Sequence, residues 1–132
     1  MAPRQTLAPR AADLERLGQE ALRQLPATFR AYLADVVLHV EEFADEDVLA
    51  ALGIEDPFQL TGLYHGRSMR HASSLASGEL PPAIHLYRRP LLEEWIETGV
   101  ALEDLITHVI VHEVGHHFGL SDDDMHALED EA

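Results

Sequence analysis

Hydrophobic and polar positions follow two periods along the chain, and each period predicts a different kind of element. The helical period is clearest over residues 11–24, where leucines recur at helical spacing, and over residues 101–118. Shorter helices are expected at 27–33, at 45–52 and from Pro90 to Glu97. The helix at 101–118 has an apolar face made of Leu102, Leu105, Ile106, Val109 and Ile110.

The strand period, in which residues alternate between two faces, predicts three strands. They are expected at 36–43, 59–65 and 83–88. The polar segment 67–82, which contains Ser, Gly and Pro, is expected to be a mobile loop. Helices and strands in this order indicate an α+β fold, with a small mixed β-sheet of about three strands and helices packed on one side of it.

A chain of 132 residues, 46% of them hydrophobic, predicts a single folded domain. We place this domain at 11–132, after an Ala/Pro/Arg-rich flexible leader at 1–10. The formal net charge is -15, which argues against nucleic acid as a partner. The chain has neither lysine nor cysteine, so Schiff-base chemistry, thiolate nucleophiles and cysteine-based metal sites are excluded.

The sequence also lacks the usual signals for a membrane or an export route. No run reaches the roughly 18 consecutive apolar residues of a membrane span, and no signal-peptide segment follows the leader. We therefore expect a cytoplasmic protein with no membrane partner. The unusual part of the composition is its nine histidines, and their placement decides which chemistry is open to the chain.

The long C-terminal helix contains the pattern H-E-x-x-H at His112, Glu113 and His116. Residues four apart lie on the same helix face, so the two imidazoles project toward one point and can bind Zn²⁺. Glu113 lies about 100° further around the helix, where it can take a proton from a metal-bound water. This spacing predicts two metal ligands and a general base within one turn of helix.

The residues after the motif provide a candidate third ligand. Gly119 follows His116 by three residues, and Asp122 follows Gly119 by three. A glycine free to adopt a left-handed conformation turns the chain back, which brings Asp122 within reach of the metal, as in metzincins, where the third ligand is usually histidine. Asp122 is the favoured ligand, and three further residues stay open as alternatives: Asp123, Asp124 and His126.

Other polar residues have a structural interpretation beside a functional one. Candidates for supporting the metal ligands or contacting substrate are His108, His126 and Tyr87, although strand packing is favoured for Tyr87 and solvation is equally open for His126. His117 is interpreted as a residue that packs in the fold or supports the metal ligands. The remaining histidines are dispersed and are interpreted as surface or satisfied strand residues: His39, His65, His71 and His85.

Three segments together resemble the small bacterial zincin-like proteins described as minimal zinc metallopeptidases. They are T-G-L-Y-H-G-R-S at 61–68, L-P-P-A-I-H-L-Y-R-R-P-L at 80–91 and V-H-E-V-G-H-H-F-G-L-S-D-D-D at 111–124. The resemblance covers roughly residues 36–128. It implies a metzincin-like α+β core with an active-site helix, in which His112, His116 and Asp122 bind one zinc per chain and Glu113 is the catalytic base.

The expected function is zinc-dependent hydrolysis of peptide bonds, in which Glu113 takes a proton from the zinc-activated water. A peptide or protein substrate would lie extended along an edge strand, either 59–65 or 83–88, and segment 67–82 could cover it. The alternative is a metal-binding or protein-interaction module that lacks turnover, and a purely structural zinc is a weaker option. A basic group could receive an acidic peptide, although internal salt bridges are favoured: Arg67, Arg70, Arg88 and Arg89.

Overall fold

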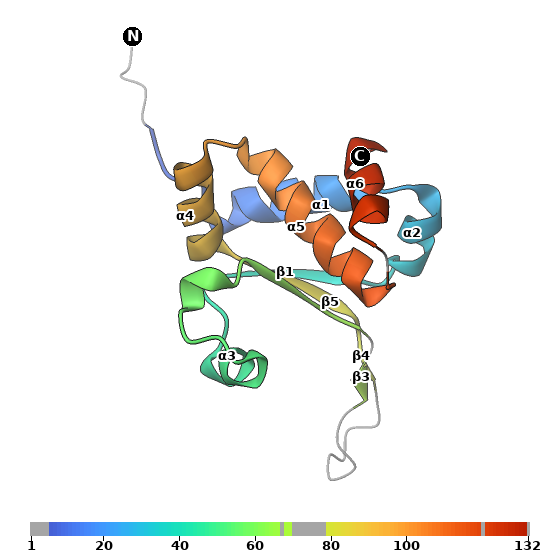
Figure 1. The fold of residues 1–132 in the computed structure, drawn as a ribbon, viewed down its shortest axis with the longest axis horizontal. Helices are drawn as coiled ribbons and strands as arrows, with labels where there is room; N and C mark the ends of the chain where they lie inside the picture. The colour runs from blue at the N-terminus through green and yellow to red at the C-terminus, as the bar shows by residue number, and fades with distance from the viewer. Residues whose placement is uncertain (1–5, 67, 70–78, 120, 132) are drawn as a thin grey trace.

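The computed structural model of the chain describes residues 6–66, 68–69, 79–119 and 121–131. Figure 1 shows a small sheet with helices packed on it. The helices are α1 (Ala11–Gln24), α2 (Ala27–Tyr32), α3 (Glu46–Leu52), α4 (Arg88–Thr98), α5 (Leu102–His117) and α6 (Asp122–Glu131), with a 3₁₀ turn η1 (Pro57–Gln59). The strands are β1 (Val37–Glu41), β2 (Gly62–His65), β3 (Ser68–Met69), β4 (Glu79–Leu80) and β5 (Ala83–Tyr87). The predicted α+β class is confirmed.

The main sheet has three strands in the order β1-β5-β2 and is mixed, as predicted. Strand β1 runs parallel to β5, with His39 opposite His85, whereas β2 runs antiparallel to β5, with Leu63 opposite His85. Because β5 lies between the other two, the prediction that 83–88 might be an edge strand is wrong. Of the two candidates, β2 is the edge strand. Among the described residues, no strand pairs with its outer side.

The main hydrophobic core lies between one face of the sheet and the helices α1 and α5. Alternation along the strands places Leu38, Ile84 and Leu86 on this face, and all three side chains are buried. Helix α5 contributes the apolar face predicted from the sequence, and α1 contributes Leu14 and Ala21. Figure 1 shows both helices crossing the same side of the sheet.

Helix α1 approaches the sheet closely because residue 18 has no side chain. A Cβ atom added at Gly18 would lie 2.7 Å from Cδ2 of Leu38 in β1. The start of α1 is held by a hydrogen bond from the backbone N–H of Arg10 to Oδ2 of Asp13, at 2.8 Å. Asp13 therefore caps this helix from its third helical position. The helix is an integral part of the core.

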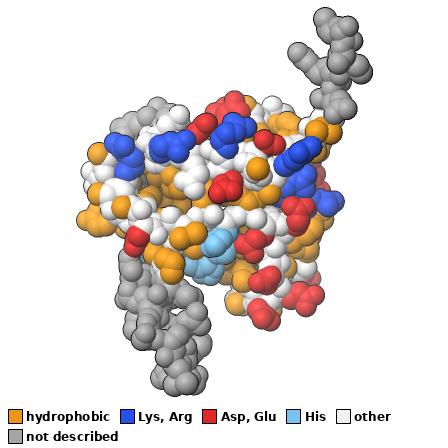
Figure 2. Space-filling model, turned by 180° about the vertical axis from the view of Figure 1, so that it is seen from behind, with side chains coloured by type: hydrophobic (Ala, Val, Ile, Leu, Met, Phe, Trp, Pro, Cys, Tyr) orange, Lys and Arg blue, Asp and Glu red, His pale blue; other side chains and the backbone are white. Residues whose placement is uncertain are grey.

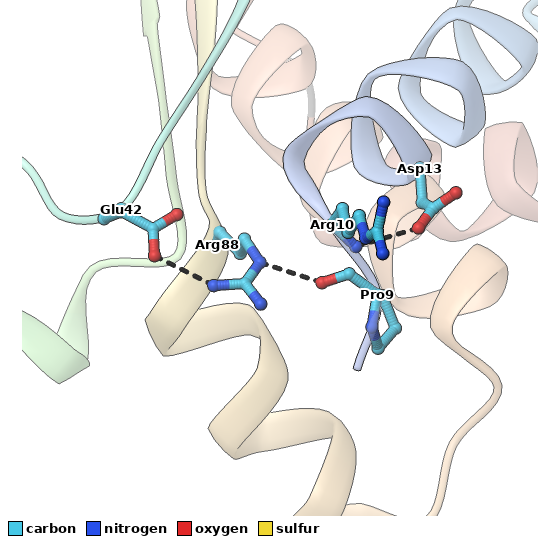
Figure 3. A network of polar contacts seen from close by, with 5 residues as sticks. All are labelled: Pro9, Arg10, Asp13, Glu42 and Arg88. Carbon is cyan, nitrogen blue, oxygen red and sulfur yellow. Dashed lines mark hydrogen bonds and ion pairs between the residues drawn. The ribbon is translucent and has the colours of Figure 1, made fainter. Parts of the chain in front are cut away.

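Arg88 joins three segments that are distant in the sequence (Figure 3). Its Nε donates to the carbonyl oxygen of Pro9, and its Nη1 donates to Oε1 of Glu42, both at 2.8 Å. Arg89 lies over the ring of Phe43, with 5.9 Å from Cζ to the ring centroid. Arg88 thus forms an internal ion pair with Glu42, as the salt-bridge interpretation expected, whereas Arg89 is exposed. Arg67 and Arg70 lie outside the described residues.

Besides the position of β5, the structure differs from the sequence-based prediction at the following elements. Strand β2 begins at Gly62 rather than at residue 59, because the Asp56 carboxylate accepts a hydrogen bond from the N–H of Phe58 and starts η1. The ends of the predicted loop 67–82 contain β3 and β4, which pair antiparallel. Helix α6 was not predicted. Helix α3 lies against the opposite face of the sheet from α1 and α5 (Figure 1), so the helices are not all on one side.

In the part of the chain that the structure describes, no helix has the length and apolar character needed to cross a membrane.

Candidate metal centre

The predicted metal-binding motif lies in the last turns of α5, on the side that the core does not cover. The helix buries eight residues against the rest of the domain, including Val109, Val111 and Val114. His112 and Glu113 are half-buried, and His116 is exposed. The same packing that fixes the apolar side of α5 therefore fixes the direction in which the motif points.

The three motif side chains come together closely enough to hold a metal ion. Their potential ligand atoms lie within 4.8 Å of one another, and among the described residues no other trio of His, Cys, Asp or Glu does so. The ring centroids of His112 and His116 are 4.1 Å apart. Two imidazoles and a carboxylate are the donor types that zinc takes in catalytic sites, so the chemistry of this set fits the ion.

Glu113 lies at the junction between helix α5 and the edge strand β2. Its Oε1 accepts a hydrogen bond from the backbone N–H of Tyr64, at 3.3 Å. Burial raises the pKa of the Glu113 carboxyl above its ordinary value, and the hydrogen bond from Tyr64 and the charge of His116 lower the pKa by less. A carboxylate with a raised pKa next to two potential metal ligands is suited to accept a proton.

His108 lies one turn before His112, and its ring contacts the ring of His112. The two rings stack with centroids 5.9 Å apart, and Nδ1 of His108 lies 2.5 Å from Oε1 of Glu129 in α6. This arrangement is compatible with the predicted supporting role of His108. The sequence analysis did not find Glu129, since the pairing depends on how α6 folds back onto α5.

His117 points toward β2 rather than toward the other motif residues. Its ring packs on Tyr64, with centroids 4.5 Å apart, and on Phe118, at 5.0 Å. A Cβ atom added at Gly66 would lie 2.5 Å from Cε1 of His117, so the imidazole occupies the space above that glycine. This is the packing role expected for His117.

The chain turns after α5 as the glycine predicted. Gly119 has a φ of +71°, and its N–H donates to the carbonyl oxygen of His116 at 3.1 Å. Helix α6 then begins at Asp122. The side chains of Asp122 and His126 lie outside the described residues, so the predicted role of each stays a prediction.

Two of the alternative third ligands can be compared from their surroundings. The hydroxyl of Ser121 accepts a hydrogen bond from the N–H of Asp124 at 3.1 Å, and Oδ2 of Asp124 accepts one from the N–H of Ser121 at 3.4 Å. This reciprocal pair caps α6. Asp123 and Asp124 are both exposed, and Asp124 is engaged in the cap at the helix start.

Tyr87 is buried in a small cluster with Ala44 and Leu49, where 2% of its surface is exposed. Burial, followed by the charges of Glu41, Asp45 and Glu113, raises the pKa of the Tyr87 hydroxyl to about 12. These surroundings match the strand-packing interpretation of Tyr87 rather than a contact with substrate. His71 lies outside the described residues.

Sequence reasoning missed one group at this site, the backbone N–H of Tyr64. The structure brings the main chain of Tyr64 to Glu113, which is 49 positions away in the sequence. Only the strand order and register could have indicated this contact. The helix-capping pair at Ser121 and Asp124, in contrast, has a sequence signal that was available.

An α+β domain whose long helix presents a His–Glu–His set beside an antiparallel edge strand defines a metal centre of the zincin type. The comparison with protein families supports the same class. The zincin-like metallopeptidase family matches residues 33–132, and the chain belongs to this family. A search of curated proteins gave no match.

Proposed function

We propose that the protein hydrolyses peptide bonds with a zinc ion held by His112, His116 and Asp122, and with Glu113 as the general base. The observation that carries the proposal is the position of Glu113, half-buried beside both imidazoles and bonded to the edge strand. Family membership supports a zinc peptidase in general, and the assignment of individual roles is ours.

The roles of the side chains follow from their surroundings. When bound, zinc lowers the pKa of a coordinated water toward about 7 and polarises a carbonyl group. Glu113 accepts a proton from the attacking water, and the protonated carboxyl then donates it to the amine of the leaving group. Burial favours the protonated form of Glu113, which helps this carboxyl hold the proton between the two steps.

Strand β2 can align an extended substrate beside Glu113. The N–H of Tyr87 donates to the carbonyl oxygen of Thr61, so every second residue of β2 after Thr61 is hydrogen-bonded to β5. The backbone groups of Gly62 and Tyr64 therefore point away from β5, and Tyr64 directs its N–H to Glu113. An extended peptide pairing with the backbone of Gly62 would add a strand at this edge.

The proposal is tested with zinc-loaded protein and a mixed peptide library, with products identified by mass spectrometry. Glu113→Gln should lower the cleavage rate by about 10²–10⁴-fold, because it removes the general base and keeps the size of the side chain. The matched control is Glu103→Gln, a change of the same kind on an exposed residue of the same helix. The control should cleave like the unchanged protein.

Each outcome distinguishes the enzyme from a metal-binding or interaction module without turnover. Cleavage that disappears with Glu113→Gln and persists with Glu103→Gln supports the peptidase. Equal traces of product in all three proteins point to a contaminating protease and contradict the proposal. Zinc content is measured in each sample, so that loss of the metal is not mistaken for loss of the base.

A further inference from the structure

Three histidines that are far apart in the sequence come together on the sheet face opposite α5. His39 lies on β1, His85 on β5 and His65 on β2. The rings of His39 and His85 are stacked with centroids 5.1 Å apart, and His65 meets His85 edge-on at 5.2 Å. These residues are dispersed in the sequence, and the fold brings them together.

The histidine cluster is separate from the metal centre on α5. Strand alternation places it on the opposite face from Leu38, Ile84 and Leu86, which pack toward α5. Helix α3 packs on this face near Tyr87 and Leu63. His39 and His65 are exposed, and His85 is half-buried between them. Figure 2 shows histidine side chains gathered at the surface of the back of the molecule, beside acidic side chains.

A carboxylate orients the central histidine of the cluster. Nδ1 of His85 lies 2.5 Å from Oε1 of Glu41, the last residue of β1. A carboxylate that accepts the Nδ1 proton fixes the tautomer in which Nε2 carries a free lone pair, and it raises the basicity of that nitrogen. Histidine ligands of metal ions commonly have such a partner. His85 is therefore prepared to bind a cation through Nε2.

The spacing of the rings suits a shared metal ion. Two imidazoles bound to one tetrahedral zinc, with bonds of about 2.0–2.1 Å, have ring centroids roughly 5 Å apart. Both distances to His85 agree with this value. The ligand atoms are less closely gathered than those of the motif on α5, so the exposed rings of His39 and His65 must rotate to converge.

The donor types of the cluster also favour a transition-metal cation. The carboxylate of Glu41 adds a negative charge next to the rings. Three imidazoles with no thiolate select for zinc, copper or nickel over magnesium or calcium.

We propose that His39, His65 and His85 form a second binding site for a divalent transition metal, in which Glu41 orients His85. Zinc is the probe for the test, and the protein carries no affinity tag, because tag histidines bind the same ions. The first site is removed by the double change His112→Ala and His116→Ala. This double variant is expected to retain zinc after metal loading and desalting, measured as metal content per chain.

A further change on the sheet face decides whether the retained zinc occupies the histidine cluster. Adding His85→Ala to the double variant should abolish the retained zinc. His39→Ala gives the same test at an exposed position, in case the change on the central strand disturbs folding, and circular dichroism checks each variant. Zinc that is absent from the double variant, or that survives both His85→Ala and His39→Ala, overturns the proposal.

Glu41 and the adjacent Glu42 offer a matched pair of variants that tests the role of Glu41. In the double variant, Glu41→Ala should weaken zinc binding by roughly 10–100-fold, because His85 loses the partner that orients it. Glu42→Ala removes the adjacent carboxylate, which pairs with Arg88 rather than with a histidine. It should leave zinc affinity unchanged. If both changes weaken zinc binding equally, the effect comes from the general loss of negative charge, and the orienting role of Glu41 is contradicted.

Discussion

The backbone N–H of Tyr64 in strand β2 donates a hydrogen bond to Oε1 of Glu113 in helix α5, at 3.3 Å. This contact joins the strand proposed to bind substrate to the residue proposed to move the proton. Movement of β2 relative to α5 would therefore change both the alignment of a peptide and the surroundings of the base.

The burial of Glu113 leads to a prediction for the stability of the metal-free protein. Because the folded-state pKa is raised, its stabilising contribution is complete below the ordinary value of 4.5 and is lost as the pH rises through the folded pKa. At neutral pH the charged carboxylate is thus a destabilising group. Glu113→Gln should increase the free energy of unfolding of the metal-free protein at neutral pH, measured by urea denaturation.

The gain should shrink as the pH falls toward 4.5 and be absent below it, where the carboxyl is protonated in both states. Glu103→Gln, on an exposed part of the same helix, controls for the general removal of negative charge. A metal-free Glu113→Gln protein that is less stable than the unchanged protein at neutral pH would show that the hydrogen bond from Tyr64 outweighs desolvation.

Asp122 is expected to complete the metal centre, and its two neighbours offer controls. Asp122→Ala should weaken zinc binding by more than the roughly 10–100-fold that follows the loss of a residue supporting a ligand. Asp123→Ala removes an exposed carboxylate and should have little effect. Zinc affinity is measured by competition with a chelator in protein lacking His85, so that the proposed second site does not contribute.

The alternatives left open by the sequence are tested in the same titration. If Asp124→Ala weakens zinc binding through the helix cap, it should also lower the stability of α6, because its carboxylate accepts the N–H of Ser121. A large loss of affinity with Asp123→Ala, together with none for Asp122→Ala, would reassign the third ligand.

Tyr87 should make stability depend on pH in alkaline solution. Its pKa is raised from 10.0 to about 12, so its contribution is complete below pH 10.0 and is lost as the pH rises through about 12. The free energy of unfolding should fall across this interval, and Tyr87→Phe should remove that part of the fall. Tyr32, which is 67% exposed, provides the control as Tyr32→Phe. Identical pH profiles for Tyr87→Phe and the unchanged protein would contradict the assignment.

Gly62 sets how closely the edge strand approaches α5. A Cβ atom at this position would lie 2.5 Å from Cγ1 of Val109 and 3.1 Å from the carbonyl oxygen of His85. Gly62→Ala should therefore cost about 1–3 kcal/mol through overpacking, measured by denaturant unfolding. It should also lower peptidase activity, since β2 and Tyr64 move away from Glu113.

Gly18→Ala is the informative comparison, because its new Cβ meets the flexible ends of leucine side chains and not backbone. Alanine also gains up to about 1 kcal/mol over glycine inside a helix. Gly18→Ala should thus cost less than Gly62→Ala and leave activity unchanged. If Gly18→Ala costs more stability than Gly62→Ala, then α5 and β2 adjust easily to the added methyl group.

The sequence was sufficient wherever one local pattern determined the outcome. The apolar face of α5, the H-E-x-x-H spacing and the left-handed Gly119 each depend on residues within a few positions, and all three features are present as predicted. Gly53 ends α3 by the same local rule. The mixed sheet followed from the order of the elements.

Features that depend on tertiary packing were not found in the sequence. Helix α6 is strongly acidic, yet its Met125 is 4% exposed and belongs to the main core. The central position of β5 required the strand order, which alternation alone does not give. The histidine cluster required both the strand order and the register, because His39 and His85 are 46 positions apart and face each other across two parallel strands.

The family match begins at residue 33, but the hydrophobic core begins earlier in the chain. Leu14 and Ala21 of α1 are buried against the segment that the family shares, and Arg88 binds the backbone of Pro9. A protein trimmed to the shared segment would expose the surface that α1 covers. The segment that the family shares is therefore shorter than the part of the chain that forms the core behind α5.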